Sequence, residues 1–181
     1  MLTVGNDAPE FALPGVTEGT TDTYSLQEST DDGRAVLLLF YPFDFSPVCT
    51  TELCTIRDAE WFEFTPGLDV WAVSGDSTHS HTAFADAHDL NFPLLSDYDA
   101  SVADAFGVRY DEHQGHRGVP KRAVFVVDPD RTVRYAWSTD DAFERPDFFH
   151  VTAAVDELEA IDDSLVPDDA DLDVMDVDPT T

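Results

Sequence analysis

The chain has 181 residues, of which 43% are hydrophobic and 12% aromatic, which is enough for one domain with a well-formed core. Asp and Glu number 38 and Lys and Arg only 9, which gives a formal charge of −29. This acidity argues against binding to nucleic acid or to anionic lipid, because both attract basic surfaces.

The acidic residues are spread along the whole chain, and Lys121 is the only lysine in it. At 1 M salt the Debye length falls to about 3 Å, so repulsion among these charges would be screened. We therefore interpret the acidity as adaptation to a salt-rich cytoplasm, which indicates a halophilic origin. An acidic interaction module is the alternative interpretation.

The sequence contains no apolar run that approaches the roughly 18 residues needed for a membrane span. Its N-terminus lacks a basic segment followed by an apolar one, so no secretory signal is predicted. We expect a cytoplasmic protein that does not bind membranes. In that compartment two cysteines are more often catalytic, metal-binding or inert than a structural disulfide.

Residues 1–34 are predicted to form strands and turns. Residues 8–15 are expected to be a short extended segment closed by a Pro-Gly turn, with 23–26 as its partner strand and 29–33 as a polar loop. The run Ala35–Phe40 (AVLLLF) is apolar throughout, which predicts a strand covered on both faces, as in a central parallel sheet.

The rest of the chain alternates helical and extended patterns. Helices are predicted over 47–64, 78–88, 100–106 and 146–161, and strands over 68–73, 92–95, 123–127 and 133–137. The tail 162–181 carries eight acidic residues and no basic one, so it is expected to be disordered or loosely docked onto a single domain at 1–161.

This order of elements predicts an α/β fold. Alternating strands and helices indicate parallel strands with right-handed crossovers, and the hairpin at 123–137 adds antiparallel ones. We therefore expect a mixed central sheet with helices on both faces.

Both cysteines fall in the segment 41–54, YPFDFSPVCTTELC, which follows the apolar strand. Cys49 is in the first turn of the predicted helix, where free N–H groups and the helix dipole favour a thiolate. Pro42 and Pro47 would rigidify the approach to it, and Ser46 offers a hydroxyl to the sulfur or to a bound oxygen. The alternative is a buried cysteine that acts as a small hydrophobic residue.

Cys54 follows Cys49 by five residues, a rise of roughly 7.5 Å and a rotation of about 140° on a helix. The two Cα atoms would then be roughly 8.7 Å apart, beyond the limit of about 7 Å for a disulfide. A bridge can form only if the start of the helix unwinds. The pair therefore suits a cycle in which Cys49 is oxidised, the helix opens locally and Cys54 closes the bridge.

The segment Pro42-x-x-x-Ser46-x-x-Cys49 resembles the active-site signature of the peroxiredoxins, Pro-x-x-x-Thr/Ser-x-x-Cys. The spacing from Cys49 to Cys54 is similar to that of the bacterioferritin-comigratory (Q-type) subfamily, whose resolving cysteine lies five residues after the peroxidatic one. The resemblance spans roughly residues 3–160, in the family's order. Its further matches are 8–11, 73–77, 81–84, 92–97 and 121–128.

The resemblance implies a thioredoxin-like fold and the reduction of hydrogen peroxide and organic hydroperoxides without metal or bound cofactor. It implies that Cys49 is the peroxidatic nucleophile and that Cys54 resolves its sulfenic acid. Pro42 would shield the thiol, Ser46 would hydrogen-bond the peroxide, and Arg122 would stabilise the thiolate and the leaving oxygen. A thioredoxin-like dithiol would reduce the disulfide of this monomer or weak dimer.

Two positions depart from the family pattern. Ser46 replaces the commoner threonine but keeps the hydroxyl, so we expect little change. Val48 stands where the subfamily usually has glycine, which is expected to narrow the approach to Cys49 and to affect the choice of substrate.

Other residues leave alternatives open. Glu52 is expected either to bond to an arginine or to the backbone near the site, or to face solvent. Arg109 is expected to form a surface salt bridge rather than to supply a second cation near the pocket. The alternative function is a metal-handling thioredoxin-fold protein that uses Cys49, Cys54 and a histidine, although its Cys-x-x-x-Cys-Pro spacing is missing. A disulfide oxidoreductase is disfavoured because the chain has no Cys-x-x-Cys motif.

Overall fold

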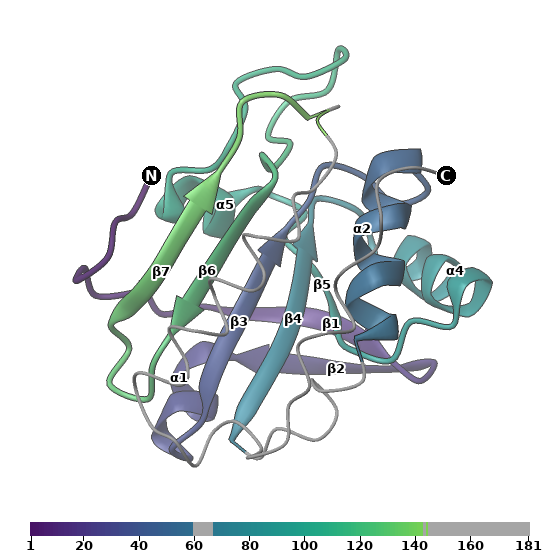
Figure 1. The fold of residues 1–181 in the computed structure, drawn as a ribbon. Coiled ribbons are helices and arrows are strands. Elements are labelled where there is room, and N and C mark those ends of the chain that lie inside the picture. Colours follow the sequence, from purple (N-terminus) through teal and green to yellow (C-terminus); the bar gives the residue numbers. More distant parts are fainter. Residues whose placement is uncertain (60–66, 143, 145–181) are drawn as a thin grey trace, which may run out of the picture.

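The computed structural model describes residues 1–59, 67–142 and 144. Within these residues a seven-stranded sheet has the order β2-β1-β5-β4-β3-β6-β7 (Figure 1). The strands are β1 (Ala12–Thr17), β2 (Thr20–Ser25), β3 (Ala35–Phe40), β4 (Leu68–Ser74), β5 (Leu94–Ser96), β6 (Ala123–Val127) and β7 (Val133–Ser138). The helices are α1 (Leu26–Asp31), α2 (Pro47–Asp58), α4 (Thr78–His88) and α5 (Ser101–Phe106).

The sheet is mixed, as the sequence predicts. Strand β4 pairs in parallel with β3 and β5, whereas β3–β6, β6–β7, β1–β2 and β1–β5 pair antiparallel. The register places Phe40, the last residue of β3, opposite Ala123, the first of β6. Residues that follow β3 and residues that precede β6 therefore meet at one edge of the sheet.

Two apolar layers cover the sheet, one on each face. Leu37 and Leu39 of β3 pack in the layer that contains α2 and α4 residues, and Val36 and Leu38 pack in the layer that contains α1 and α5 residues. Every residue of β3 is buried, which explains its unbroken apolar sequence. The central strand is thus a rigid support for whatever follows Phe40.

The N-terminal hairpin corrects one prediction. Pro14 and Gly15 lie inside β1, and the chain turns instead at Glu18 and Gly19, both of which have positive φ angles. A Cβ atom at Gly15 would meet Leu95 Cδ2 at 2.4 Å. Gly15 therefore permits close strand packing and does not form a turn.

A second correction concerns residues 29–33, which were expected to form a loop. Helix α1 occupies Leu26–Asp31, and the hydroxyl of its N-cap Ser25 accepts a hydrogen bond from the N–H of Glu28. The Ser-x-x-Glu spacing of a capping box, Ser25 to Glu28, is a sequence signal for the start of this helix. The polar composition of the segment concealed it.

Strand β1 begins four residues later than predicted and β2 three residues earlier, whereas β3 to β7, α4 and α5 agree with their predicted ranges within two residues. Helix α5 ends at Gly107, whose φ of 70° is the left-handed conformation common after a helix. Helix α2 ends at Asp58 with Ala59 as its non-helical C-cap, so the predicted end at residue 64 was wrong. The predicted helix 146–161 and tail 162–181 lie outside the described residues. Among the described helices, none has the length and hydrophobicity that a transmembrane helix requires.

Candidate active site

The start of α2 holds Cys49 at the end of the most buried strand. Figure 1 shows α2 beginning beyond the end of β3 and running back along the sheet. Ser46 is the N-cap, Pro47 is the first helical residue, and Cys49 lies in the first turn with no exposed surface. The first N–H groups of a helix lack intrahelical partners and carry partial positive charge. The structure therefore places Cys49 beside these N–H groups, in the first turn of the helix where the sequence analysis expected it.

Arg122 reaches the thiol from the neighbouring strand. It precedes β6, so the pairing of β6 with β3 brings its guanidinium to the start of α2. Its Nη2 donates to Cys49 Sγ at 3.3 Å and to the carbonyl oxygen of Ala142 at 3.2 Å. The side chain is fully buried, and its Nε has no hydrogen-bond partner in the part of the chain described here. A fixed cation therefore contacts the sulfur directly.

Glu52 completes this group. It lies three residues after Cys49 on the same helix face, is 2% exposed, and forms an ion pair with Nη1 of Arg122. Of the two alternatives for Glu52, the structure shows the bond to arginine. Burial raises the pKa of Glu52 to about 6, against the opposing effect of Arg122. Burial acts to lower the pKa of Arg122, but Glu52 and Cys49 outweigh it and raise that pKa.

Cys54 lies on the same unbroken helix as Cys49, and both thiols are free. Cys49 is buried, whereas Cys54 is half-buried against the same apolar layer. Because both residues lie in one helix, the expected separation of their Cα atoms is roughly 8.7 Å, more than the limit of about 7 Å for a disulfide. Joining them requires the start of α2 to open.

The loop between β3 and α2 carries the two other predicted site residues. Pro42 is buried and Ser46 is half-buried, and the Ser46 hydroxyl makes no capping bond to α2. Between them Phe45 has a φ of 58°, a left-handed conformation that costs a residue with a side chain about 1–2 kcal/mol. Strain of this kind persists where surrounding contacts enforce it.

A hollow of about 630 Å³ opens over this loop. Pro42 and Ser46 line it together with Ala142, whose carbonyl binds Arg122. Its other walls come from 43–45, 75–76, Pro47, Tyr98, 113–114 and 116–119. Phe43 and Phe45 line it beside polar side chains such as Asp44 and Gln114. Neither Cys49 nor Arg122 lines this hollow, which adjoins the thiol group through Pro42, Ser46 and Ala142.

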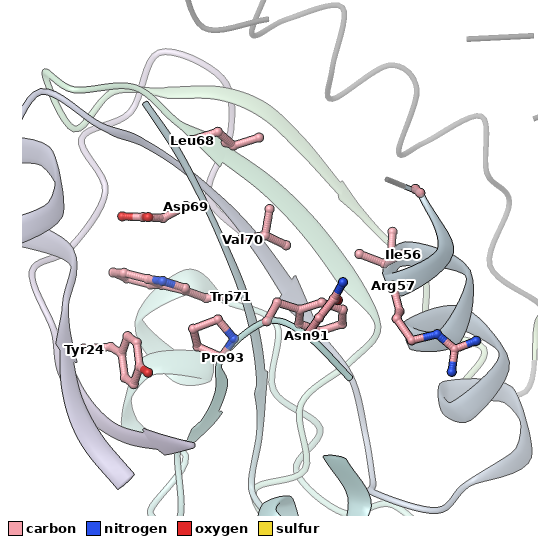
Figure 2. Close-up of a pocket in the computed structure, with 11 residues that line it drawn as sticks. Tyr24, Ile56, Arg57, Leu68, Asp69, Val70, Trp71, Asn91 and Pro93 are labelled. Carbon is pink, nitrogen blue, oxygen red and sulfur yellow. The ribbon is translucent and has the colours of Figure 1, made fainter. Parts of the chain in front are cut away.

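A second hollow, of about 270 Å³, lies at the other end of α2 (Figure 2). Ile56 and Arg57 from α2 face Val70 and Trp71 of β4 across it. None of the predicted catalytic side chains lines this hollow. It is therefore not the place of the thiol chemistry.

The other candidates are occupied elsewhere. Arg109 forms an ion pair with Asp104 at 3.0 Å, as the sequence predicts. His81 is buried against Asp44 and the carbonyl of Leu95. Across residues 1–59, 67–142 and 144, no group of three His, Cys, Asp or Glu side chains could hold a metal ion. The metal-handling alternative therefore gains no support from this region.

Comparison with known proteins gives a consistent answer. Residues 4–136 match the AhpC/TSA family. The chain is 35% identical over 142 residues to the putative peroxiredoxin bcp of Coxiella burnetii, an alignment that covers 75% of this chain and 88% of that protein. The chain belongs to the AhpC/TSA family of peroxiredoxins. A putative peroxiredoxin of Mycobacterium tuberculosis is 39% identical over 133 residues, or 71% of this chain and 80% of the relative.

Solved structures confirm the thioredoxin-like fold of this peroxiredoxin. The crystal structure of peroxidoxin BcpB from M. tuberculosis is similar with a TM-score of 0.74 and 30% identity, covering 89% of this chain and 99% of that one. The mitochondrial 2-Cys peroxiredoxin of Plasmodium falciparum has a TM-score of 0.76 at 23% identity, covering 90% and 97%. The family membership makes this chain a thiol-dependent peroxidase.

Proposed function

We propose that this thiol-dependent peroxidase uses an atypical two-cysteine cycle in which Cys49 is the peroxidatic residue and Cys54 the resolving one. The observation that carries the proposal is the contact of 3.3 Å between Arg122 Nη2 and Cys49 Sγ inside a fully buried group. A fixed guanidinium stabilises negative charge on sulfur and on a leaving oxygen. That charge pattern is what peroxide reduction by a thiolate creates.

In the first step the Cys49 thiolate attacks one oxygen of a hydroperoxide. An S–O bond forms, the O–O bond breaks, and the leaving oxygen takes a proton to become water or an alcohol. Arg122 holds the thiolate and the leaving oxygen, Ser46 donates a hydrogen bond to the peroxide, and Pro42 keeps water from the sulfur. The sulfur is oxidised to a sulfenic acid while the peroxide is reduced.

In the second step Cys54 attacks the oxidised sulfur of Cys49. The S–O bond breaks, water leaves, and a disulfide joins the two residues. The start of α2 must open for this step, because an intact helix keeps the sulfurs apart. A thioredoxin-like dithiol then reduces the disulfide and restores the helix.

The charge of −29 supports a further part of the proposal. We propose a cytoplasmic enzyme of a salt-rich cell that acts as a monomer or weak dimer and binds neither nucleic acid nor membranes. Because salt shortens the Debye length from about 10 Å at 0.1 M to about 3 Å at 1 M, its melting temperature should rise steeply with NaCl. A melting temperature that is constant over this range would contradict the assignment to a salt-rich cell.

The test of the cycle is a pair of cysteine variants assayed with hydrogen peroxide and a thioredoxin system. Cys49→Ser should lose peroxide turnover entirely. Cys54→Ser should consume one equivalent of peroxide at the normal rate and then stop. Sustained turnover by Cys49→Ser would refute the assignment of the peroxidatic residue, and sustained thioredoxin-dependent turnover by Cys54→Ser would refute that of the resolving residue.

A further inference from the structure

A buried polar cluster beside the thiol takes no part in the cycle proposed above. The carboxylate of Asp44 accepts hydrogen bonds from the hydroxyls of Tyr41 and Ser80, each at 2.7 Å, and faces Nδ1 of His81 at 3.0 Å. The side chains of Asp44 and His81 are 1% and 0% exposed. The cluster fastens the loop between β3 and α2 to α4.

The hydrogen-bond partners of His81 tie its ring to two elements of the fold. Its Nε2 lies 3.1 Å from the carbonyl oxygen of Leu95, and a carbonyl only accepts, so Nε2 carries a proton. Its Nδ1 lies 3.0 Å from Asp44 Oδ2 and 3.4 Å from the hydroxyl of Tyr41, which also donates to Asp44. His81 therefore links the loop carboxylate to the strand that contains Leu95.

The loop that the cluster holds is the strained one. Phe45, with its φ of 58°, directly follows Asp44 and directly precedes Ser46, the N-cap of α2. The N–H of Asp44 also donates to Asp76 Oδ2 at 2.8 Å, so this residue is held through both its main chain and its side chain. A left-handed residue with a side chain keeps its conformation only where neighbours enforce it. The bonds of Asp44 hold the residue next to Phe45, and the Phe45 ring itself contacts that of Phe84, with the ring centroids 5.0 Å apart.

We propose that Asp44 and His81 are positioning residues for peroxide reduction: their bond holds Phe45 in its left-handed conformation and so places Pro42 and Ser46 over the Cys49 thiol. The inference rests on the proposed function, because it takes Pro42 and Ser46 as walls of the peroxide site. A buried hydrogen-bonded pair adds little net stability over two apolar side chains of the same shape. Because the bond between Asp44 and His81 lies beside the strained loop, its role is to position that loop rather than to stabilise the whole fold.

Oxidation of Cys49 and closure of the disulfide should respond differently when the bond between Asp44 and His81 is weakened. Attack on the peroxide needs the loop in place, so weakening the pair should slow the oxidation of Cys49. Closure of the Cys49–Cys54 bridge needs the start of α2 to leave its site, so weakening the pair should not slow closure. A purely structural role would not separate the two steps in this way.

The experiment measures both rate constants by rapid quenching, alkylation and mass spectrometry, with hydrogen peroxide and the full chain. His81→Phe should lower the rate constant of Cys49 oxidation by about tenfold or more, since small misplacements near a reacting group have large effects on rate. Closure should be as fast as in the wild type or faster. Ser80→Ala, which removes one of the donors to Asp44, should give a smaller loss of the same kind.

Two further variants separate positioning from stability. Asp44→Asn can accept from Tyr41 and donate to the unprotonated Nδ1 of His81, so it should recover most of the oxidation rate that Asp44→Ala loses. Asp97→Asn is the matched control. Asp97 is also a buried carboxylate, which caps α5 by accepting from the N–H groups of Val102 and Ala103. It should lower the melting temperature and leave both rate constants unchanged.

The inference is overturned if His81→Phe and Ser80→Ala oxidise within twofold of the wild type, or if Asp97→Asn slows oxidation as much as His81→Phe does. It is also overturned if Asp44→Asn is as slow as Asp44→Ala. Failure of the proposed function would look different, because hydrogen peroxide would then leave Cys49 unoxidised in the wild type itself.

Discussion

The two ends of α2 are held in different ways. At its start, Cys49 and Glu52 contact the buried cation of Arg122, and the preceding loop is bonded to α4 through Asp44 and His81. Toward its end, Leu53 and Ile56 pack in the apolar layer that covers the sheet. Polar contacts depend on the charge of the sulfur, whereas apolar contacts do not. Oxidation of Cys49 can therefore loosen the first turn while the rest of the helix stays docked.

The largest expected effect comes from removing the cation at the start of α2. Arg122→Met should lower the rate constant of Cys49 oxidation by about 10²–10³-fold, the loss typical for a fixed charge-stabilising donor. It should also destabilise the fold by about 3–5 kcal/mol, because Glu52 stays buried without a partner. Stopped-flow oxidation and urea unfolding measure the two effects.

The matched control for that variant removes both members of the ion pair. Arg122→Met with Glu52→Leu should regain most of the lost stability, since two apolar side chains replace two buried charges. Its oxidation rate should remain low. Recovery of the rate together with the stability would show that Arg122 acts only through folding.

The next effect concerns the apolar end of the helix. Ile56→Ala, at a site that is 2% exposed, should cost about 2–4 kcal/mol of unfolding free energy through lost packing and a cavity. Because Ile56 lies seven residues after Cys49, about 10.5 Å farther along the helix, the rate constant for Cys49 oxidation should stay within about twofold. A tenfold loss of rate in this variant would contradict the separation of the two ends.

The smallest effect is a pH dependence of stability from Glu52. Its pKa in the folded protein, about 6, is raised above the ordinary 4.5. The folded state therefore binds the proton more tightly, so stability from this group is full below pH 4.5 and decreases as pH rises to 6. The decrease should be about 1–2 kcal/mol. Urea unfolding of the wild type and of Glu52→Gln at both pH values should show it in the wild type alone.

The sequence predicted the central strand, the helix with both cysteines and the strand that begins after Arg122, because each has an unambiguous apolar pattern or signature. It misplaced Gly15 and missed α1. In both cases the deciding contact cannot be read from composition. At Gly15 it is a close approach to Leu95, and at α1 it is a capping bond from the N–H of Glu28 to Ser25.

Within the site, the sequence brought Cys49, Ser46, Pro42 and Arg122 together through the resemblance. It did not predict that Asp44 and His81 bond across 37 positions of the chain. Pairing at that distance depends on how α4 packs against the loop, which periodicity does not reveal. The signal available in the sequence was Asp44 itself, a carboxylate between the signature residues Pro42 and Ser46.

The most direct test of the cycle is to oxidise the reduced protein with one equivalent of hydrogen peroxide in high salt and to map its cysteines by mass spectrometry over time. The account predicts a sulfenic acid on Cys49 first and then an intramolecular Cys49–Cys54 disulfide, with one water released in each step. A stable sulfenic acid on Cys49, or a disulfide only between chains, would contradict it.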